Sequence, residues 1–245
     1  HGTNDAPVVS HVVTHQAADE DTAFSFALPA NTFSDIDTGD SFTVSASGLP
    51  AWLSFDAATG TFSGTPHNSD VGTTQVTVTA TDSHGAQVST TFDLVVNNTN
   101  DAPTLSPIAS VNVDEDGAQA SGQFTATDPD TGDTLTYSIA SPVAGLVVNS
   151  DGSWHFDPTD AAYQSLPDGQ TQQITIPVTV TDAAGATDTQ SLTITLTGSN
   201  DGATINGSDV ATLKEDQTAD KLYAQGRLSI SDVDTGEAGF DVQSG

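Results

Sequence analysis

A four-residue sequence, Asn-Asp-Ala-Pro, recurs at intervals of about one hundred residues and divides the chain into similar units. It occurs at residues 4–7 and 100–103, and a degenerate copy, Asn-Asp-Gly-Ala, occurs at residues 200–203. Proline fixes its own φ and holds the preceding residue in extended geometry, so each intact copy suits a short, stiff connector. The interval predicts two units of ordinary domain size, residues 1–99 and 100–199, and the start of a third at residues 200–245.

Apolar and small polar residues alternate between the connectors, which is typical of half-buried β-strands separated by glycine- and proline-containing turns. We expect strands at residues 8–13, 23–28, 42–44, 52–55, 61–63, 75–80 and 88–96, and again at 111–113, 123–127, 135–139, 146–148, 154–156, 174–180 and 191–196. About seven short strands per unit predict an all-β fold of tandem Greek-key β-sandwiches. The third unit offers only the first few strands, near 210–213 and 224–230, so we expect an incomplete sandwich that is mobile, swapped or borrowed as an added strand.

The charge balance is strongly acidic, with 33 acidic residues, three basic residues and a formal net charge of −30. Lys214, Lys221 and Arg227 are the only bases, so residues 1–213 contain no lysine or arginine. Ion pairing therefore cannot neutralise the first two units, and their counterions must come from solution. Such a field repels phosphates and anionic lipids, so we expect no nucleic-acid partner and no membrane insertion.

Cysteine is absent, which excludes disulfides, zinc–thiolate sites and thiol nucleophiles. Metal ions are then the remaining means of stapling small domains, which is compatible with an extracellular location where calcium is abundant. The chain opens without a signal peptide and stops within a repeat, so we expect it to be a segment of a longer protein. We also expect it to be monomeric.

The acidic residues recur in phase with the connectors. The glutamates 20, 115 and 215 are spaced 95 and 100 residues apart, and Asp82 and Asp182 are spaced 100 residues apart. A single such acid is most simply a turn former or a solvated loop charge, but in-phase recurrence without any base favours a repeated site for Ca²⁺, which takes six to eight hard oxygens. An EF-hand does not fit residues 35–40, because glycine is fifth rather than sixth in that loop. The candidate metal ligands are Asp5, Glu20, Asp35, Asp37, Asp70, Asp82, Asn100, Asp101, Glu115, Asp128, Asp130, Asp182, Asn200, Asp201, Glu215, Asp232 and Asp234.

Stretches in all three units of the sequence resemble known families. Residues 48–56, 59–66 and 79–82 of the first unit resemble the dystroglycan-type cadherin-like domain, whereas residues 151–154, 178–185 and 196–201 resemble the VCBS repeat of giant RTX-type bacterial surface adhesins. Residues 210–237 resemble the first part of another such repeat. The resemblance implies calcium-binding linkers, an extracellular position on the bacterial cell surface, a role in adhesion and biofilm formation, and type I secretion.

The resemblance to cadherin junctions also implies how the ligands are shared. The central junction would use Asn100 and Asp101, Glu20 from the first unit, and Asp128, Asp130 and Asp182 from the second. Asp70 stands where cadherins place an acid of their Asp-Arg-Glu motif, although residues 68–70 here read Asn-Ser-Asp. The outer junctions are incomplete: Asp5 lacks a preceding unit, and Asn200 and Asp201 have Glu115, Asp232 and Asp234 but no late aspartate.

The sequence favours two functional classes over catalysis. No pair of carboxylates stands out at the spacing that a glycosidase needs, and the six histidines are dispersed. Trp52 and Trp154 lie in alternating strands, which favours a core position over stacking on a sugar. The first class is a calcium-stiffened extender whose partners are neighbouring domains of the same chain and which projects ligand-binding domains from the cell. The alternative is a module that itself binds a peptide or glycan in a calcium-dependent manner.

Overall fold

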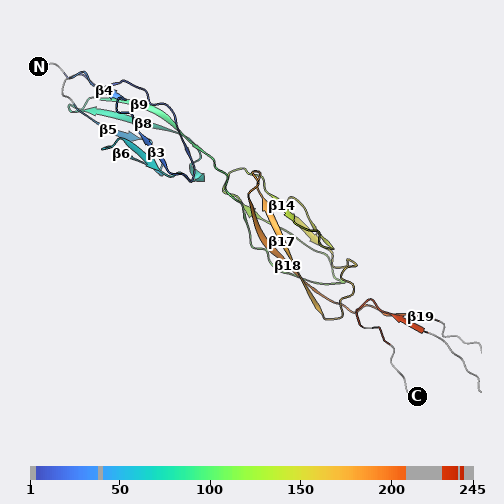
Figure 1. Cartoon of the computed structure of the whole chain (residues 1–245). Helices are drawn as coiled ribbons and strands as arrows, with labels where there is room; N and C mark the ends of the chain where they lie inside the picture. Colours follow the sequence, from blue (N-terminus) through green and yellow to red (C-terminus); the bar gives the residue numbers. More distant parts are fainter. Residues whose placement is uncertain (1–3, 38–40, 208–227, 237, 240–245) are drawn as a thin grey trace, which may run out of the picture. The chain divides into compact units, whose positions relative to one another are not determined.

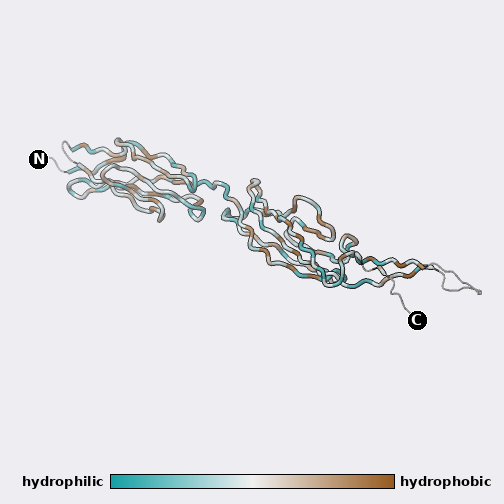
Figure 2. Tube along the Cα trace, turned by 60° about the horizontal axis from the view of Figure 1, so that its bottom comes forward, coloured by the Kyte–Doolittle hydropathy of each residue, from teal (hydrophilic) through white to brown (hydrophobic). Residues whose placement is uncertain are grey.

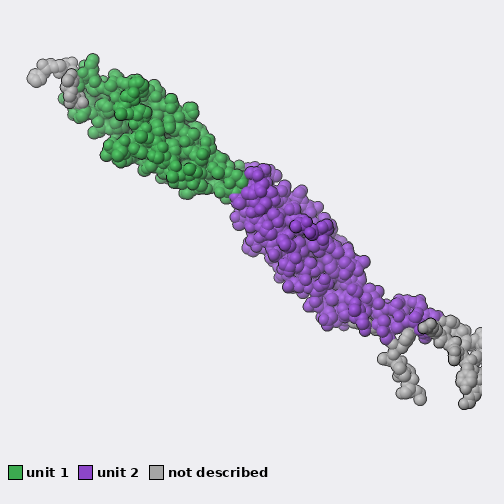
Figure 3. Space-filling view, viewed as in Figure 1, with its two compact units in different colours: residues 1–101, 129–131 green, residues 102–128, 132–245 purple. Residues whose placement is uncertain are grey.

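The computed structural model describes residues 4–37, 41–207, 228–236 and 238–239. Its contacts define two compact units, residues 1–101 with 129–131 and residues 102–128 with 132–245 (Figure 3). Each unit contains a β-sandwich, which confirms the predicted fold class (Figure 1). Within the described residues, no helix has both the length and the apolar character needed to cross a membrane. The division into three parts at residues 99/100 and 199/200 stays a prediction.

The first sandwich consists of a four-stranded sheet in the order β2-β9-β8-β5, a three-stranded sheet in the order β3-β7-β6, and the pair β1-β4. Strand β2 runs parallel to β9, and the other pairs are antiparallel. The elements are β1 (Val8–Val9), β2 (Gln16–Asp19), β3 (Phe24–Ala27), β4 (Phe33–Ser34), β5 (Phe42–Ser47), β6 (Leu53–Asp56), β7 (Thr61–Gly64), the 3₁₀ turn η1 (Asn68–Asp70), β8 (Gly72–Asp82) and β9 (Gln87–Asn97).

The second sandwich repeats this topology, with sheets β11-β18-β17-β14 and β12-β16-β15 and the pair β10-β13. Strand β11 runs parallel to β18, as β2 does to β9. The elements are β10 (Thr104–Leu105), β11 (Val111–Asp114), β12 (Ala120–Gln123), β13 (Ala126–Thr127), β14 (Thr136–Ile139), β15 (Leu146–Val148), β16 (Ser153–Phe156), β17 (Thr171–Thr181) and β18 (Thr187–Thr197).

The long hairpin of each sandwich contributes the centre of its core. Buried residues recur at every second position in the inner parts of β8 and β9, so these side chains point inward. Figure 2 shows hydrophobic and hydrophilic residues interspersed along the strands of both sandwiches. The same positions are buried 100 residues later in β17 and β18. The paired inward residues are Val76, Val78, Ala80, Phe92, Leu94 and Val96 in the first sandwich, and Ile176, Val178, Val180, Leu192, Ile194 and Leu196 in the second.

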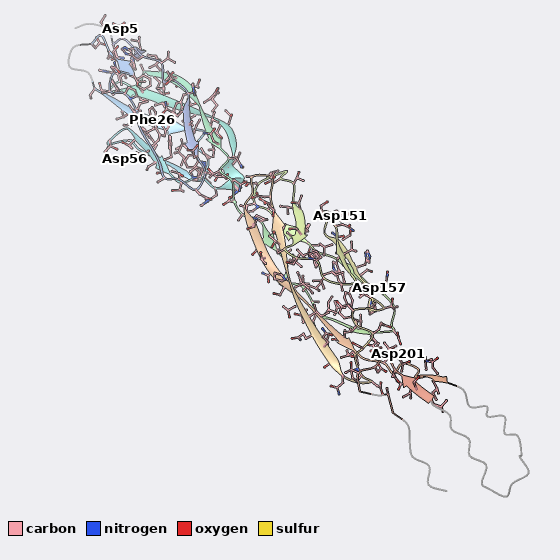
Figure 4. All side chains as sticks on the ribbon, turned by 45° about the vertical axis from the view of Figure 1, so that its right-hand side comes forward. Asp5, Phe26, Asp56, Asp151, Asp157 and Asp201 are labelled. Carbon is pink, nitrogen blue, oxygen red and sulfur yellow. The ribbon has the colours of Figure 1, made fainter. Side chains whose placement is uncertain are left out.

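Aromatic residues complete each core. Phe62 contacts the rings of Phe26, Phe55 and Phe92 at centroid distances of 4.5–6.1 Å, and Phe26 lies in the interior of the sandwich (Figure 4). In the second sandwich Trp154 is 8% exposed and stacks on Phe124 at 5.9 Å. The core interpretation of Trp154 is therefore confirmed, and Trp52 is half-buried against the first core.

Two predicted strands were wrong in extent. The expected strand 8–13 ends at Val9, because the chain crosses there from the β1-β4 pair to the sheet in which β2 joins β9. The expected strand 123–127 is split, because Gln123 belongs to β12, which pairs with β16, whereas Ala126 and Thr127 form β13, which pairs with β10. Strands β2 and β4 and the turn η1 were not predicted.

The chain after the second sandwich begins another antiparallel pair, β19 (Thr204–Gly207) with β20 (Leu228–Ser231). Ile205 occupies the register position that Leu105 holds in the β10-β13 pair. Leu105 is 2% exposed in the second core, whereas Ile205 is 59% exposed. The expected strand 210–213 and most of 224–230 lie outside the described residues, so the predicted fate of this tail stays a prediction.

We expect Phe62→Ala to lower the free energy of unfolding of the first sandwich by about 3–5 kcal/mol, because Phe62 is 1% exposed and its removal leaves a cavity. Calorimetry of the whole chain should show the transition of the first sandwich at lower temperature and that of the second unchanged. The exposed Ser25→Ala in β3 is the control and should change stability by less than about 0.5 kcal/mol. Equal effects of the two variants would contradict this core assignment.

Candidate metal centres

One hydrogen bond recurs at all three connectors. The main-chain N–H of the connector aspartate donates to a carboxylate oxygen of the second acid in an Asp-x-Asp loop. The three bonds are Asp5 to Asp37 (2.7 Å), Asp101 to Asp130 (2.8 Å) and Asp201 to Asp234 (2.7 Å). The repeated connector thus fixes the same loop each time. Figure 4 labels two of these connector residues, Asp5 and Asp201.

A buried glutamate follows the parallel strand of each sandwich. The Glu20 N–H donates to Asn97 O at 3.1 Å, and Glu20 Oε1 accepts the Thr99 N–H at 2.7 Å. The second sandwich repeats both bonds, from Glu115 N–H to Thr197 O (2.9 Å) and from Ser199 N–H to Glu115 Oε1 (3.3 Å). Both glutamates are 0% exposed, and Oε2 of each has no hydrogen-bond partner among the described residues.

These acids gather into two equivalent clusters. Glu20 lies with Asp101 and Asp130, and each offers a carboxylate oxygen within 4.8 Å of the other two. Glu115, Asp201 and Asp234 form the same arrangement. Oxygens bound to one Ca²⁺ at roughly 2.3–2.6 Å lie at most about 5 Å apart, so the spacing suits such an ion. A buried carboxylate oxygen without a donor is costly, and a cation is the partner that would satisfy it.

A third cluster lies in the loops of the second sandwich, where Asp128, Asp133 and Asp182 approach one another within the same 4.8 Å. Asp182 also closes the β17-β18 turn, because its Oδ1 accepts the N–H groups of Gly185 (2.6 Å) and Ala186 (2.8 Å). Gly185 has φ 99°, a conformation that glycine adopts without strain. The sequence analysis missed Asp133 as a candidate ligand.

The corresponding end of the first sandwich holds Asp35 and Asp82. Asp82 Oδ1 accepts the N–H groups of His84 and Ala86, and its Oδ2 accepts the Asn4 amide at 2.9 Å. The Asn4 amide is the main reason that the pKa of Asp82 is lowered. Asp35 Oδ2 is buried and has no hydrogen-bond partner among the described residues. The sequence counterpart of Asp133 here, Asp40, lies outside them.

Each sandwich matches the model of a known domain family. Residues 6–97 match the model of a putative Ig domain, and residues 100–198 match the model of a bacterial cadherin-like domain. The first sandwich is therefore similar to an Ig domain and the second to a bacterial cadherin-like domain. The resemblance to bacterial cadherin-like domains is confirmed, although the matching model covers the second unit, whereas the sequence motifs placed that resemblance on the first. The resemblance to VCBS repeats and RTX-type adhesins stays a prediction.

Curated relatives are surface adhesins. The chain is 31% identical over 186 residues to the serine-rich adhesin for platelets of Staphylococcus aureus strain MRSA252, across 72% of this chain and 12% of that protein. The same identity holds for the strain USA300 protein, of which 7% is covered. The chain therefore spans only about a tenth of the length of these relatives.

Solved structures with the same fold are cadherin ectodomains. Extracellular cadherin domains 1–4 of protocadherin gamma B7 match with a TM-score of 0.54 and 17% identity, over 96% of this chain and 61% of that one. Mouse cadherin-23 EC22–24 matches with a TM-score of 0.55 and 18% identity, over 84% of this chain and 71% of that one. At this identity the likeness establishes the fold.

Burial and repulsion between negative charges raise the pKa of two acids in the second cluster. Burial raises the pKa of Glu115, and the charges of Asp234, Asp201 and Asp116 raise it further. Burial likewise raises the pKa of Asp201, with contributions from Asp116, Asp234 and Asp232. The fold therefore holds these acids close together although their negative charges repel one another.

The remaining candidates take other positions. Asp70 Oδ2 accepts the His67 N–H at 3.0 Å and lies outside the three clusters found among the described residues. The amides of Asn100 and Asn200 donate to the carbonyl oxygens of the aspartates that follow them, at 3.1 and 2.8 Å. Asp232 Oδ1 accepts the Asp234 N–H at 3.1 Å. Glu215 lies outside the described residues.

The raised pKa of Glu115 predicts how stability depends on pH in metal-free buffer. Between its ordinary value of 4.5 and its raised folded value, the folded chain binds more protons than the unfolded chain, so stability falls as pH rises through that window. Glu115→Gln removes the repelling charge and should weaken this fall. Thermal unfolding from pH 4 to 7 in buffer stripped of metals measures both profiles.

The matched control for this prediction is Asp151→Asn, which removes a charge from an acid that binds Ser153 in an exposed turn, where hydrogen bonds lower its pKa. It should not weaken the fall of stability with rising pH above 4.5. If Glu115→Gln and wild type gave parallel profiles, burial of the Glu115 charge would not matter for stability.

Proposed function

We propose that the clusters bind Ca²⁺ and that the chain is a calcium-stiffened extender region of a large secreted bacterial adhesin. The observation that carries the proposal is Glu20 Oε2, a fully buried carboxylate oxygen that lacks a hydrogen-bond partner among the described residues and lies beside Asp101 and Asp130. With no lysine or arginine in residues 1–213, a dissolved cation is the available counter-charge.

Calcium suits these clusters better than other common ions. All candidate ligands are hard oxygens, which excludes preference for soft metals, and there is no cysteine in the chain. Magnesium demands near-ideal octahedral geometry and retains its waters, whereas Ca²⁺ accepts irregular arrangements of carboxylates and carbonyls. The proposed ligands at the connector are Asn100, Asp101, Glu20 and Asp130, and the loop cluster adds Asp128, Asp133 and Asp182.

The connector geometry supports a stiffening role. Asp101 lies in the connector, Glu20 follows β2 of the Ig-like domain, and Asp130 belongs to the loop after β13, whose residues 129–131 group with the first unit. One ion held by these three acids would restrain the connector and that loop together. Without the ion, unneutralised carboxylates a few ångströms apart repel one another and loosen the connector.

The biological assignment draws on the relatives. Serine-rich adhesins for platelets contain segments similar to this chain, and the cadherin-like fold is common to extended ectodomains. We propose that repeats of this kind project ligand-binding domains from the bacterial surface for attachment to cells or other surfaces, including in biofilms. The proposed partners are neighbouring domains of the same chain, the location is extracellular, and the role involves no catalysis.

We expect 10 mM Ca²⁺ to stabilise the first unit by about 1.4–2.7 kcal/mol if Kd is about 10⁻⁴ to 10⁻³ M, as for extracellular calcium modules. Asp101→Asn removes a charge and weakens an oxygen ligand, so it should abolish most of this gain. Thermal unfolding with calcium and with chelator measures the difference. Small-angle scattering of the same samples should show a stiffer chain in calcium for wild type only.

The matched control is Asp56→Asn, which removes the same charge from an exposed turn where Asp56 accepts from Ala58 and Thr59. It should retain the calcium response of wild type. Identical melting and scattering with calcium and chelator would refute the proposal. Calcium-dependent binding of the isolated chain to cells, glycans or peptides, without stiffening, would favour the alternative of a ligand-binding module.

A further inference from the structure

The turn η1 brings an amide against the first metal cluster. The turn is held by Asp70 N–H donating to His67 O (2.7 Å) and by His67 N–H donating to Asp70 Oδ2 (3.0 Å). It is also tied to the acidic turn after β2, because Asp21 N–H donates to Pro66 O at 2.8 Å and the His67 ring contacts Asp21 Oδ1 at 3.0 Å. The side chain of the first residue of η1, Asn68, is therefore presented from a fixed backbone.

Asn68 uses this position to hold the connector aspartate. Its Nδ2 donates to Asp101 Oδ2 at 2.6 Å, across 33 residues of sequence, and both side chains are partly buried. An ionised carboxylate only accepts hydrogen bonds, so the amide nitrogen must face it. Such charge-assisted bonds are stronger than bonds between neutral groups. The contact leaves the other carboxylate oxygen of Asp101 for the cluster.

The second cluster, Glu115 with Asp201 and Asp234, lacks this contact within the described part of the chain. The main-chain bond from Asp201 to Asp234 is present, but among the described residues no side-chain amide donates to the Asp201 carboxylate. The charges of Asp116, Asp234 and Asp232 face it instead. The two clusters have equivalent acids, and among the described residues only the first has an amide donor on its connector aspartate.

We propose that Asn68 is a neutral positioning residue that holds Asp101 in place for the cation, and that it limits the charge of this cluster to three carboxylates. The proposal rests on the calcium binding proposed above. An aspartate at position 68 would add a further oxygen ligand but would place a fourth negative charge against Asp101 where residues 1–213 supply no base. Compared with a carboxylate at this position, the amide therefore stabilises the metal-free fold, whereas a carboxylate would bind the cation more tightly.

The test compares Asn68→Ala and Asn68→Asp in the full chain by amide NMR during calcium titration. Thr99 N–H reports the first cluster through Glu20, and Ser199 N–H reports the second through Glu115. We expect the midpoint at Thr99 to rise about tenfold in Asn68→Ala, since a hydrogen bond to a charged group contributes roughly that factor. In Asn68→Asp the midpoint should fall below the wild-type value, whereas melting in chelator should move to lower temperature. The midpoint at Ser199 should stay constant.

Opposite changes in Asn68→Asp separate positioning from a purely structural role, which would weaken binding and lower the melting temperature together. Asn97→Ala is the matched control, because it removes an exposed amide bond to Asp19 (3.0 Å) and leaves the cluster intact. Weaker binding in Asn68→Asp, or unchanged Thr99 midpoints in both variants, would overturn the inference. Absence of any calcium response at Thr99 in wild type would instead overturn the proposed function.

Discussion

The burial of glutamate at the end of each sandwich is the constraint on which the rest of the arrangement depends. Glu20 and Glu115 are 0% exposed, and each uses one carboxylate oxygen to accept the N–H of a residue in the connector that follows. That bond fixes where the chain leaves the sandwich. The second oxygen has no protein donor among the described residues. This second oxygen is the atom that the proposed cation would satisfy.

An aspartate in the long hairpin of each sandwich also has more than one structural role. Asp82 and Asp182 each accept two or more main-chain N–H groups and so close the hairpins whose strands form the two cores. Asp182 also belongs to the cluster with Asp128 and Asp133. Because one carboxylate serves both the turn and the cluster, folding of the hairpin prepares part of the site. If this cluster binds a metal ion as proposed, binding and folding would be linked through the same side chain.

Sequence periodicity predicted the parts of the structure that depend on local pattern or on the repeat. The 100-residue interval relates the buried positions of β8 and β9 to those of β17 and β18, and in-phase recurrence marked Glu20 and Glu115. The resemblance to cadherin junctions is what grouped Glu20 with Asp101 and Asp130. Periodicity failed where tertiary contacts decide. The crossing after Val9 depends on which sheet pairs with β2, and Asn68 meets Asp101 only because η1 is tied to the turn at Asp21. Asp133 was also missed, although it recurs in phase with Asp40 at the end of the same loop in the first repeat.

The small difference between the two glutamate clusters shows how repeats diverge without changing their fold. A fourth carboxylate near three buried acids would need compensation, and residues 1–213 offer no basic side chain for it. An amide supplies a donor at no cost in charge, which is what the first cluster has at Asn68. The second cluster has Asp116 nearby, and burial together with these charges raises the pKa of Glu115 and of Asp201. Because Asp21 holds in the first repeat the sequence position of Asp116 in the second, the feature that distinguishes the first cluster is the Asn68 amide on its connector aspartate.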